Sequence, residues 1–80
     1  MKIFIFSRKC FIKYNNIKIL KIFFKKKSFS IMNNYVPTIK NIDFVLFYLK
    51  NKFFKIRLKN SFFIHRNIEL KIICDNYEFL

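Results

Sequence analysis

The sequence predicts a mainly α-helical protein with extended segments, in which a small basic helix-loop-helix precedes an extended cationic strip and little independent core forms. Two patterns and the length lead to this fold class. Apolar residues recur at helical spacing in the first half, and apolar and basic residues alternate in the second half. A chain of 80 residues makes one domain at most, so residues 1–80 are expected to form a single small basic domain.

The first helix is predicted over residues 8–27. Ile17, Leu20 and Phe24 follow an i, i+3, i+7 pattern, which places them on one side of a helix. Three lysines repeat this spacing one position later, and they are Lys18, Lys21 and Lys25. The pattern therefore predicts an apolar stripe beside a basic stripe.

A loop is predicted over residues 28–37, because this segment lacks charge and contains Asn33-Asn34 and Val36-Pro37. A second helix is predicted over 38–50, with Thr38 as its N-cap. Four apolar residues hold the i, i+3, i+4, i+7 spacing of a helix face, and they are Ile42, Val45, Leu46 and Leu49.

The segment 53–60 is expected to be extended. Strict alternation from Phe54 to Lys59 places Lys55, Arg57 and Lys59 on one side of it. Such a strip can bind phosphates, or it can be an edge strand whose lysines oppose aggregation. The nearby aromatic residues are expected to pack in the core rather than to stack on bases, and they are Phe53, Phe54, Phe62 and Phe63.

The C-terminal element, 66–80, fits two structures equally well. Ile68, Leu70 and Ile72 have the spacing of a strand, whereas Ile68, Ile72 and Ile73 have that of a helix.

The charge balance indicates a polyanionic partner. Seventeen Lys and Arg stand against four Asp and Glu, for a formal net charge of +13. Codons rich in A and T favour Lys but do not exclude Asp or Glu, so the scarcity of acid is the informative part. Nucleic acid is the first candidate partner and an anionic membrane the second. A solvated basic surface without any partner is the simplest alternative.

The composition also indicates the genome. Gly, Ala, Gln and Trp are absent, whereas residues with AT-rich codons, such as Phe, Ile, Asn and Lys, are abundant. We therefore expect an organelle-encoded product of a mitochondrion or another organelle, with the cytoplasm of an AT-rich endosymbiont as the alternative. The longest strongly apolar run, 44–49, is far shorter than the roughly 18–20 residues that cross a bilayer.

Catalytic and metal-binding chemistry is not expected, nor is a cofactor or a small-molecule substrate. The four acids are scattered, and His65 and Cys74 make only a weak base–nucleophile combination. Zinc needs about four clustered ligands, which the lone Cys10 and Cys74 do not supply. Two buried thiols are expected, and a Cys10–Cys74 disulfide is the open alternative.

Several short motifs resemble the small-subunit ribosomal protein fourteen family. Lys9 to Tyr14 is similar to its K-x-x-x-K-Y, and 19–31 to its A-L-K-x-x-I-K-x-x-S-L-S-L. The run 57–60 resembles its R-L-R-N, and 63–71 its F-G-L-S-R-x-x-L-R. These blocks keep the family order, but the T-G-R loop and the C-terminal tail of the family are missing.

The resemblance implies a structural constituent of an organellar, and most simply mitochondrial, small ribosomal subunit. The partners would be ribosomal RNA and neighbouring small-subunit proteins. The RNA-binding residues that we expect from the resemblance and from the basic pattern are Lys9, Lys13, Lys18, Lys21, Lys25, Lys55, Arg57, Lys59, Asn60, Arg66 and Lys71. Two alternatives stay open: a small membrane-associated subunit of an organellar respiratory or ATP synthase complex, and a spurious AT-rich reading frame.

Overall fold

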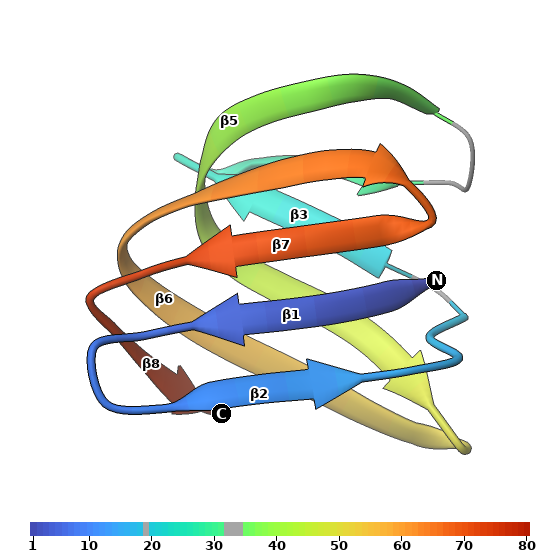
Figure 1. The fold of residues 1–80 in the computed structure, drawn as a ribbon, viewed down its shortest axis with the longest axis horizontal. Helices are drawn as coiled ribbons and strands as arrows, with labels where there is room; N and C mark the ends of the chain where they lie inside the picture. Colours follow the sequence, from blue (N-terminus) through green and yellow to red (C-terminus); the bar gives the residue numbers. More distant parts are fainter. Residues whose placement is uncertain (19, 32–34) are drawn as a thin grey trace.

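The computed structural model describes residues 1–18, 20–31 and 35–80, and in these ranges it contains eight strands and no helix (Figure 1). The predicted mainly α-helical fold class is therefore wrong. The strands are β1 (Lys2–Phe6), β2 (Phe11–Tyr14), β3 (Leu20–Phe24), β4 (Lys27–Ile31), β5 (Tyr35–Leu49), β6 (Lys52–Asn67), β7 (Glu69–Ile73) and β8 (Asn76–Phe79).

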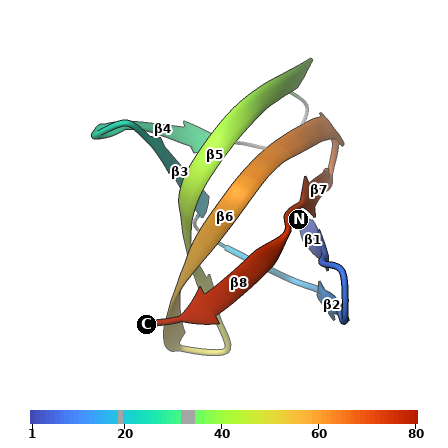
Figure 2. The same ribbon diagram turned by 90° about the vertical axis from the view of Figure 1, so that its left-hand side faces the viewer.

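All strands belong to one sheet, which the long β5–β6 hairpin divides into two halves. One half has the order β2-β1-β7-β6-β5, and in the other β8 and β3 flank the hairpin, with β4 beyond β3. Neighbouring strands are antiparallel except for β1 and β7, which are parallel. Figure 2 shows β5 and β6 curving through both halves, so the sheet wraps around its own inner face.

The hairpin bends where the register between β5 and β6 shifts. Ile42 faces Ser61, whereas Phe44 faces Arg57, so extra residues of β6 lie opposite Asp43. One of them, Asn60, has a φ of 48°, and the buried Ser61 hydroxyl donates a hydrogen bond of 2.6 Å to the Ile42 carbonyl. A bulge of this kind bends a strand and turns a corner between packed sheets.

The change of partner along β6 follows this bend. Before it, residues 56–59 pair with β8, and after it, residues 62–66 pair with β7. Beyond β6, Asp75 joins the two regions, because its backbone N–H donates to the Lys59 carbonyl and its carboxylate accepts a 3.0 Å hydrogen bond from Asn60.

The inner face carries a continuous hydrophobic core, contrary to the prediction of little independent core. Aliphatic side chains alternate inward along β1, β3 and β7 and at Ile56 and Leu58 of β6, and Phe47 and Phe63 are the largest fully buried side chains. The core residues are Ile3, Ile5, Ile17, Leu20, Ile22, Ile42, Val45, Phe47, Ile56, Leu58, Phe63, Leu70, Ile72 and Cys74. Isoleucine and phenylalanine favour pleated, half-buried strands, so this composition suits the fold.

The turns adopt left-handed backbone without any glycine. Lys25-Lys26 links β3 to β4 with φ values of 49° and 67°, and Lys50-Asn51 links β5 to β6 with 50° and 63°. Two positive φ angles in a two-residue loop define a type I′ turn, which matches the twist of the flanking strands. Lysine occupies this region at a steric cost that glycine avoids.

The first predicted helix, 8–27, is instead β2, a connecting segment and β3. Leu20 and Ile22 are buried while Lys21 between them is exposed, which is the alternation of a strand. The Ile17–Leu20 spacing looks helical because Ile17 is buried from the connection before β3 rather than from the strand itself. Ile19 lies outside the described residues.

The predicted loop 28–37 and the second helix 38–50 are also corrected. Strand β4 reaches Ile31 and β5 begins at Tyr35, and Asn33-Asn34 lie outside the described residues. Within β5, Ile42 and Val45 are both buried although three positions separate them, because the register shifts between them. This bulge produces the spacing that mimics a helix face.

The later segments are strands. The extended segment expected over 53–60 lies within β6, where Ile56 and Leu58 are buried between exposed cations. Of the two structures that fitted 66–80, the strand is the one formed, as β7 and β8, and Leu70 and Ile72 are buried. Phe63 is buried and Phe54 and Phe62 are partly buried, but Phe53 is exposed, so the packing expectation is wrong for Phe53.

His65 is the one histidine, and it is buried in this core at 1% exposure. Across the strands it faces Thr38 and Leu70, neither of which titrates. Loss of solvent lowers the pKa of His65 below its ordinary value of 6.5, against a smaller raising effect from a hydrogen bond with the Asn67 backbone. Among the described residues, no polar group partners its Nε2 atom.

Lys26→Gly should raise the free energy of unfolding by about 1 kcal/mol, because it relieves a left-handed lysine. The matched control, Lys27→Gly, removes the same charge one position later but lies in β4. It should lower stability by about 0.5–1 kcal/mol, since glycine loses more conformational freedom than lysine when it is fixed in a strand. Urea titrations measure both, and equal effects of the two substitutions would contradict the type I′ turn.

Protonation of His65 should oppose folding. Because its folded-state pKa lies below the unfolded value, the unfolded chain binds more protons in acid. The stability from neutral His65 is therefore complete above about pH 6.5 and is lost as the pH falls towards the folded-state pKa. Urea unfolding from about pH 5 to 8 should show this dependence in the wild type and not in His65→Phe. The same pH dependence in both proteins would rule out His65 as its cause.

Candidate nucleic-acid interface

The outer surface of β3, β5 and β6 brings basic and apolar side chains together. Residues that face each other across antiparallel strands project to the same side. Lys21, Leu46 and Lys55 form one cross-strand row, and Phe23, Phe44 and Arg57 form the next. With Lys59, which follows Arg57 along β6, we call these residues the cationic face.

Phe44 lies at the centre of this face. The Lys55 ammonium lies 5.2 Å and the Arg57 guanidinium 5.6 Å from the centroid of its ring. Both distances are in the range of cation–π attraction, which orients the two cations over the ring without neutralising them. An anion approaching the sheet therefore meets positive groups that are held in place.

One acid borders the cationic face. Glu78 on β8 faces Arg57, and the Arg57 Nη1 atom lies 3.6 Å from its carboxylate oxygen. Both side chains are more than half exposed, and ion pairs of this kind contribute about 0–1 kcal/mol. A phosphate can therefore displace Glu78 from Arg57 at little cost.

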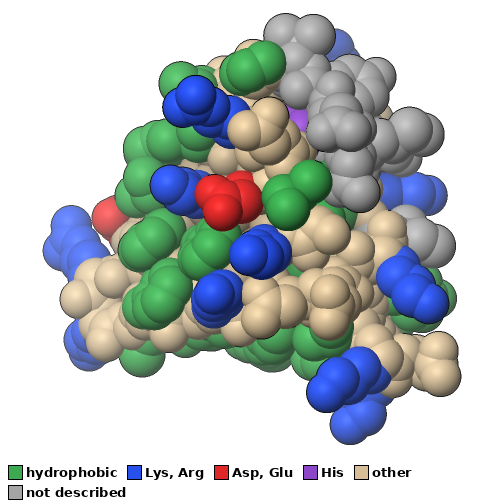
Figure 3. Space-filling view, turned by 45° about the vertical axis from the view of Figure 1, so that its right-hand side comes forward, with side chains coloured by type: hydrophobic (Ala, Val, Ile, Leu, Met, Phe, Trp, Pro, Cys, Tyr) green, Lys and Arg blue, Asp and Glu red, His purple; other side chains and the backbone are tan. Residues whose placement is uncertain are grey.

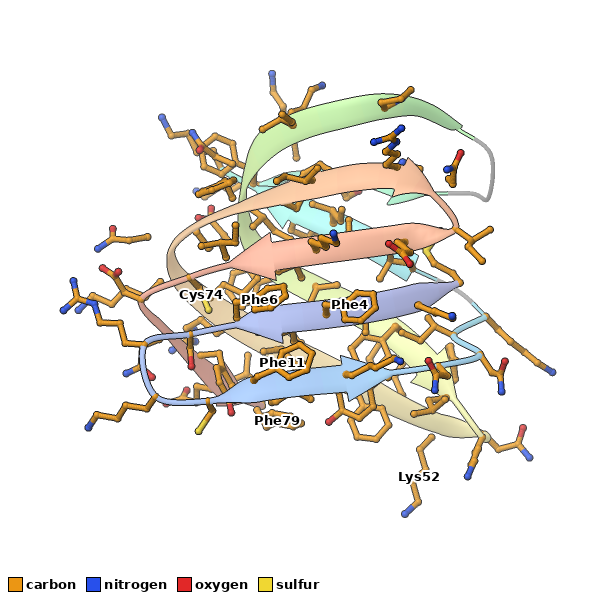
Figure 4. The ribbon with its side chains drawn as sticks, viewed as in Figure 1. Phe4, Phe6, Phe11, Lys52, Cys74 and Phe79 are labelled. Atoms are coloured by element: carbon orange, nitrogen blue, oxygen red, sulfur yellow. The ribbon has the colours of Figure 1, made fainter. Side chains whose placement is uncertain are left out.

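The tip of the β5–β6 hairpin adds residues that were not predicted from the sequence. Tyr48 and Phe53 face each other on the outer surface, directly beside the Lys50-Asn51 turn. Lys50 lies in the turn and Lys52 follows it, and Figure 4 shows Lys52 extending away from the body of the protein. The near-symmetric run from Tyr48 to Phe53, with cations between two aromatics, could have indicated this hairpin.

The predicted RNA-binding lysines of residues 8–27 do not form one stripe. Lys21 lies on the cationic face, whereas Lys13 lies on the other half of the sheet. Lys25 occupies a turn, where its backbone N–H donates to the Asp43 carboxylate at 2.9 Å. Lys18 precedes β3 and its N–H donates to the Tyr48 carbonyl, which places Lys18 near the hairpin tip.

Two further predicted residues, Lys9 and Asn60, border a hollow of about 370 Å³ beside the β1–β2 turn, and Lys59 of the cationic face borders it as well. Arg8 and Asp75 also line it. Asp75 binds Asn60 and also lies 3.5 Å from the Arg8 Nε atom. The Asp75 carboxylate therefore already accepts a hydrogen bond from the Asn60 amide, and it offsets part of the positive charge of this hollow.

The remaining predicted residues belong to the other half of the sheet. Lys13 and Lys71 flank Phe4 across β2, β1 and β7, and Arg66 faces Glu69. Figure 3 shows one side of the protein, on which more Lys and Arg side chains than acidic ones are visible. Hydrophobic side chains form a patch on the same side. The aromatic members of the outer surface of β1 and β2 are Phe4, Phe6 and Phe11 (Figure 4).

The groups considered for catalysis are separated. His65 faces Leu70, four residues before Cys74, a distance of about 13 Å along a strand. Cys74 is buried with its thiol against the Phe6 carbonyl, and burial raises its thiol pKa, as does the nearby Asp75 charge. Both cysteines are free thiols, and Cys10 is exposed, so the expectation of two buried thiols is wrong for Cys10.

Within the described residues, no helix has the length and apolarity that a membrane crossing requires. No protein-family model matches the sequence, and a comparison with curated proteins finds no significant match.

Proposed function

We propose that this protein binds RNA as a structural component of a ribonucleoprotein. The observation that carries the proposal is the cationic face, where Lys21, Lys55, Arg57 and Lys59 project from adjoining strands. Glu78, which faces Arg57, is held only by an exposed ion pair. A formal charge of +13 on 80 residues repels itself, and a polyanion relieves this repulsion.

The strand geometry suits contacts with a sugar-phosphate backbone. Side chains on one side of a strand repeat every 6.6–6.8 Å or so, which is close to the step between successive phosphates. Lys55, Arg57 and Lys59 occupy such alternate positions of β6. Arg57 can grip two phosphate oxygens with its planar fork, whereas each lysine makes a point contact.

The setting that we propose is the small ribosomal subunit of an organelle, and this part rests on the sequence resemblance alone. The helix with a basic stripe that was predicted over residues 8–27 is instead β2, a connecting segment and β3. RNA binding is therefore argued from the charge and geometry of the sheet, independently of the family.

Binding of a labelled single-stranded RNA should weaken as salt increases. Lys21→Gln with Lys55→Gln should reduce the slope of log affinity against log salt by about 1.4, since each lost phosphate contact removes about 0.7. Fluorescence anisotropy over a salt series measures this slope. A wild-type affinity that does not change with salt would end the proposal.

The matched control for that experiment is Lys13→Gln with Lys71→Gln. These lysines flank Phe4 across three strands as Lys21 and Lys55 flank Leu46. The two double variants therefore have the same net charge and the same spacing on different halves of the sheet. The control should keep most of the slope, and an equal reduction in both variants would show generic charge attraction instead of binding at the cationic face.

The ribosomal setting is tested by co-sedimentation with small subunits from an organellar extract. Arg57→Glu should reduce co-sedimentation far more than Lys2→Glu. The comparison is matched because each cation faces an acid on a neighbouring strand, Glu78 for Arg57 and Glu69 for Lys2. No loss from Arg57→Glu would contradict assembly through the cationic face.

A further inference from the structure

We propose that Tyr48 and Phe53 form a stacking site for an unpaired nucleic-acid base, so that the preferred ligand is single-stranded. This inference rests on the proposed function and specifies its ligand. The two residues are a cross-strand pair, with ring centroids 4.9 Å apart and an interplanar angle of 63°. Their side chains are 40% and 54% exposed, which leaves ring surface open to a ligand.

The backbone beneath this pair is firmly held. On the inner side of the same strands, Phe47 and Phe54 stack with centroids 5.2 Å apart, and Tyr14 packs against both. Two aromatic pairs therefore alternate through the end of the hairpin, one buried and one exposed. The inner pair stabilises the strands, so the outer rings present a fixed surface. Binding of a base therefore costs little conformational entropy in the protein.

The surroundings of the pair are strongly basic. Lys50 and Lys52 are exposed at the turn, Lys55 lies next along the outer side of β6, and Lys18 is linked to the Tyr48 carbonyl through its backbone N–H. The sequence contains no Asp or Glu from 44 to 68. Charge complementarity therefore favours a ligand that combines a flat ring with phosphate.

An unpaired base satisfies both requirements. In a duplex, the base faces are covered by neighbouring bases, so a ring on the protein cannot reach them. In a single strand, each base can stack on an aromatic side chain while the backbone contacts lysines, which is how small sheet proteins hold such strands. A simple acidic polymer would contact the lysines but gain nothing from the rings.

A second aromatic pair on the opposite half of the sheet supplies a control. Phe6 and Phe11 have centroids 4.9 Å apart and exposures of 39% and 57%, close to those of Tyr48 and Phe53. Their cross-strand neighbour on β7 is the apolar Ile73. Truncating this pair removes a similar exposed area from a place where no base is proposed to stack.

The test measures binding of two fluorescein-labelled probes by anisotropy: an oligouridylate of about twelve nucleotides, a typical single-strand site size, and an abasic oligomer of the same length. Tyr48→Ala with Phe53→Ala should weaken oligouridylate binding about tenfold, the scale of stacking one base, and leave abasic binding unchanged. Phe6→Ala with Phe11→Ala should change neither, and Tyr48→Phe should keep wild-type affinity because the ring and not the hydroxyl is used.

Each outcome decides between the two proposals. If the wild type binds both probes equally and Tyr48→Ala with Phe53→Ala has no effect, the stacking site is overturned while RNA binding stands. An equal loss with both probes would also overturn it, because charge or folding would then be the cause. If the wild type binds neither probe at low salt, the proposed function itself fails.

Discussion

The bend in the β5–β6 hairpin is the constraint on which the rest of the structure depends. One hairpin supplies strands to both halves of the sheet. It bends between them, because the register between β5 and β6 shifts next to Asp43 and Asn60 adopts a left-handed conformation. The hydrogen bond from Ser61 to the Ile42 carbonyl satisfies a backbone acceptor inside the bend. The same strand, β6, pairs with β8 before the bend and with β7 after it.

The same alternation that fills the core also creates the proposed RNA-binding surface. In β6, the buried Ile56 and Leu58 are each followed by an exposed cation, Arg57 and Lys59. Core and interface are thus two sides of one strand, and their spacings are linked. The aromatic residues follow this rule as well, because Phe54 faces the core and Phe53 faces solvent although they are neighbours in sequence.

The local pattern of 53–60 could be predicted from the sequence because strict alternation has one structural solution. The two helix predictions were wrong for a specific reason. An irregularity in an otherwise alternating segment gives its buried residues an i, i+3 spacing, as on a helix. In β5 the bulge near Asp43 places Ile42 and Val45 on one side, and periodicity alone cannot distinguish this from a helix turn. The enrichment in isoleucine and phenylalanine favoured strands, but AT-rich codons explain the same enrichment.

The candidate interface was only partly accessible to sequence reasoning. Lys55, Arg57 and Lys59 follow from local alternation, but Lys21 joins them only through pairing of β3 with β5 and β5 with β6. Tyr48 and Phe53 become neighbours through the tight turn at Lys50-Asn51. That turn carries no glycine, so the strongest sequence signal for a hairpin was missing.

The parallel pairing of β1 with β7 has a consequence for synthesis of the chain. Lys2–Phe6 at the start of the chain pairs with residues 69–73 near its end, and β7 in turn completes the pairing of the second half of β6. During translation, β1 therefore cannot pair with β7 until residues 69–73 have left the exit tunnel. Pairing over such a sequence separation forms slowly, so Ile3 and Ile5, which are fully buried in the folded protein, stay outside the completed core until β7 has been made.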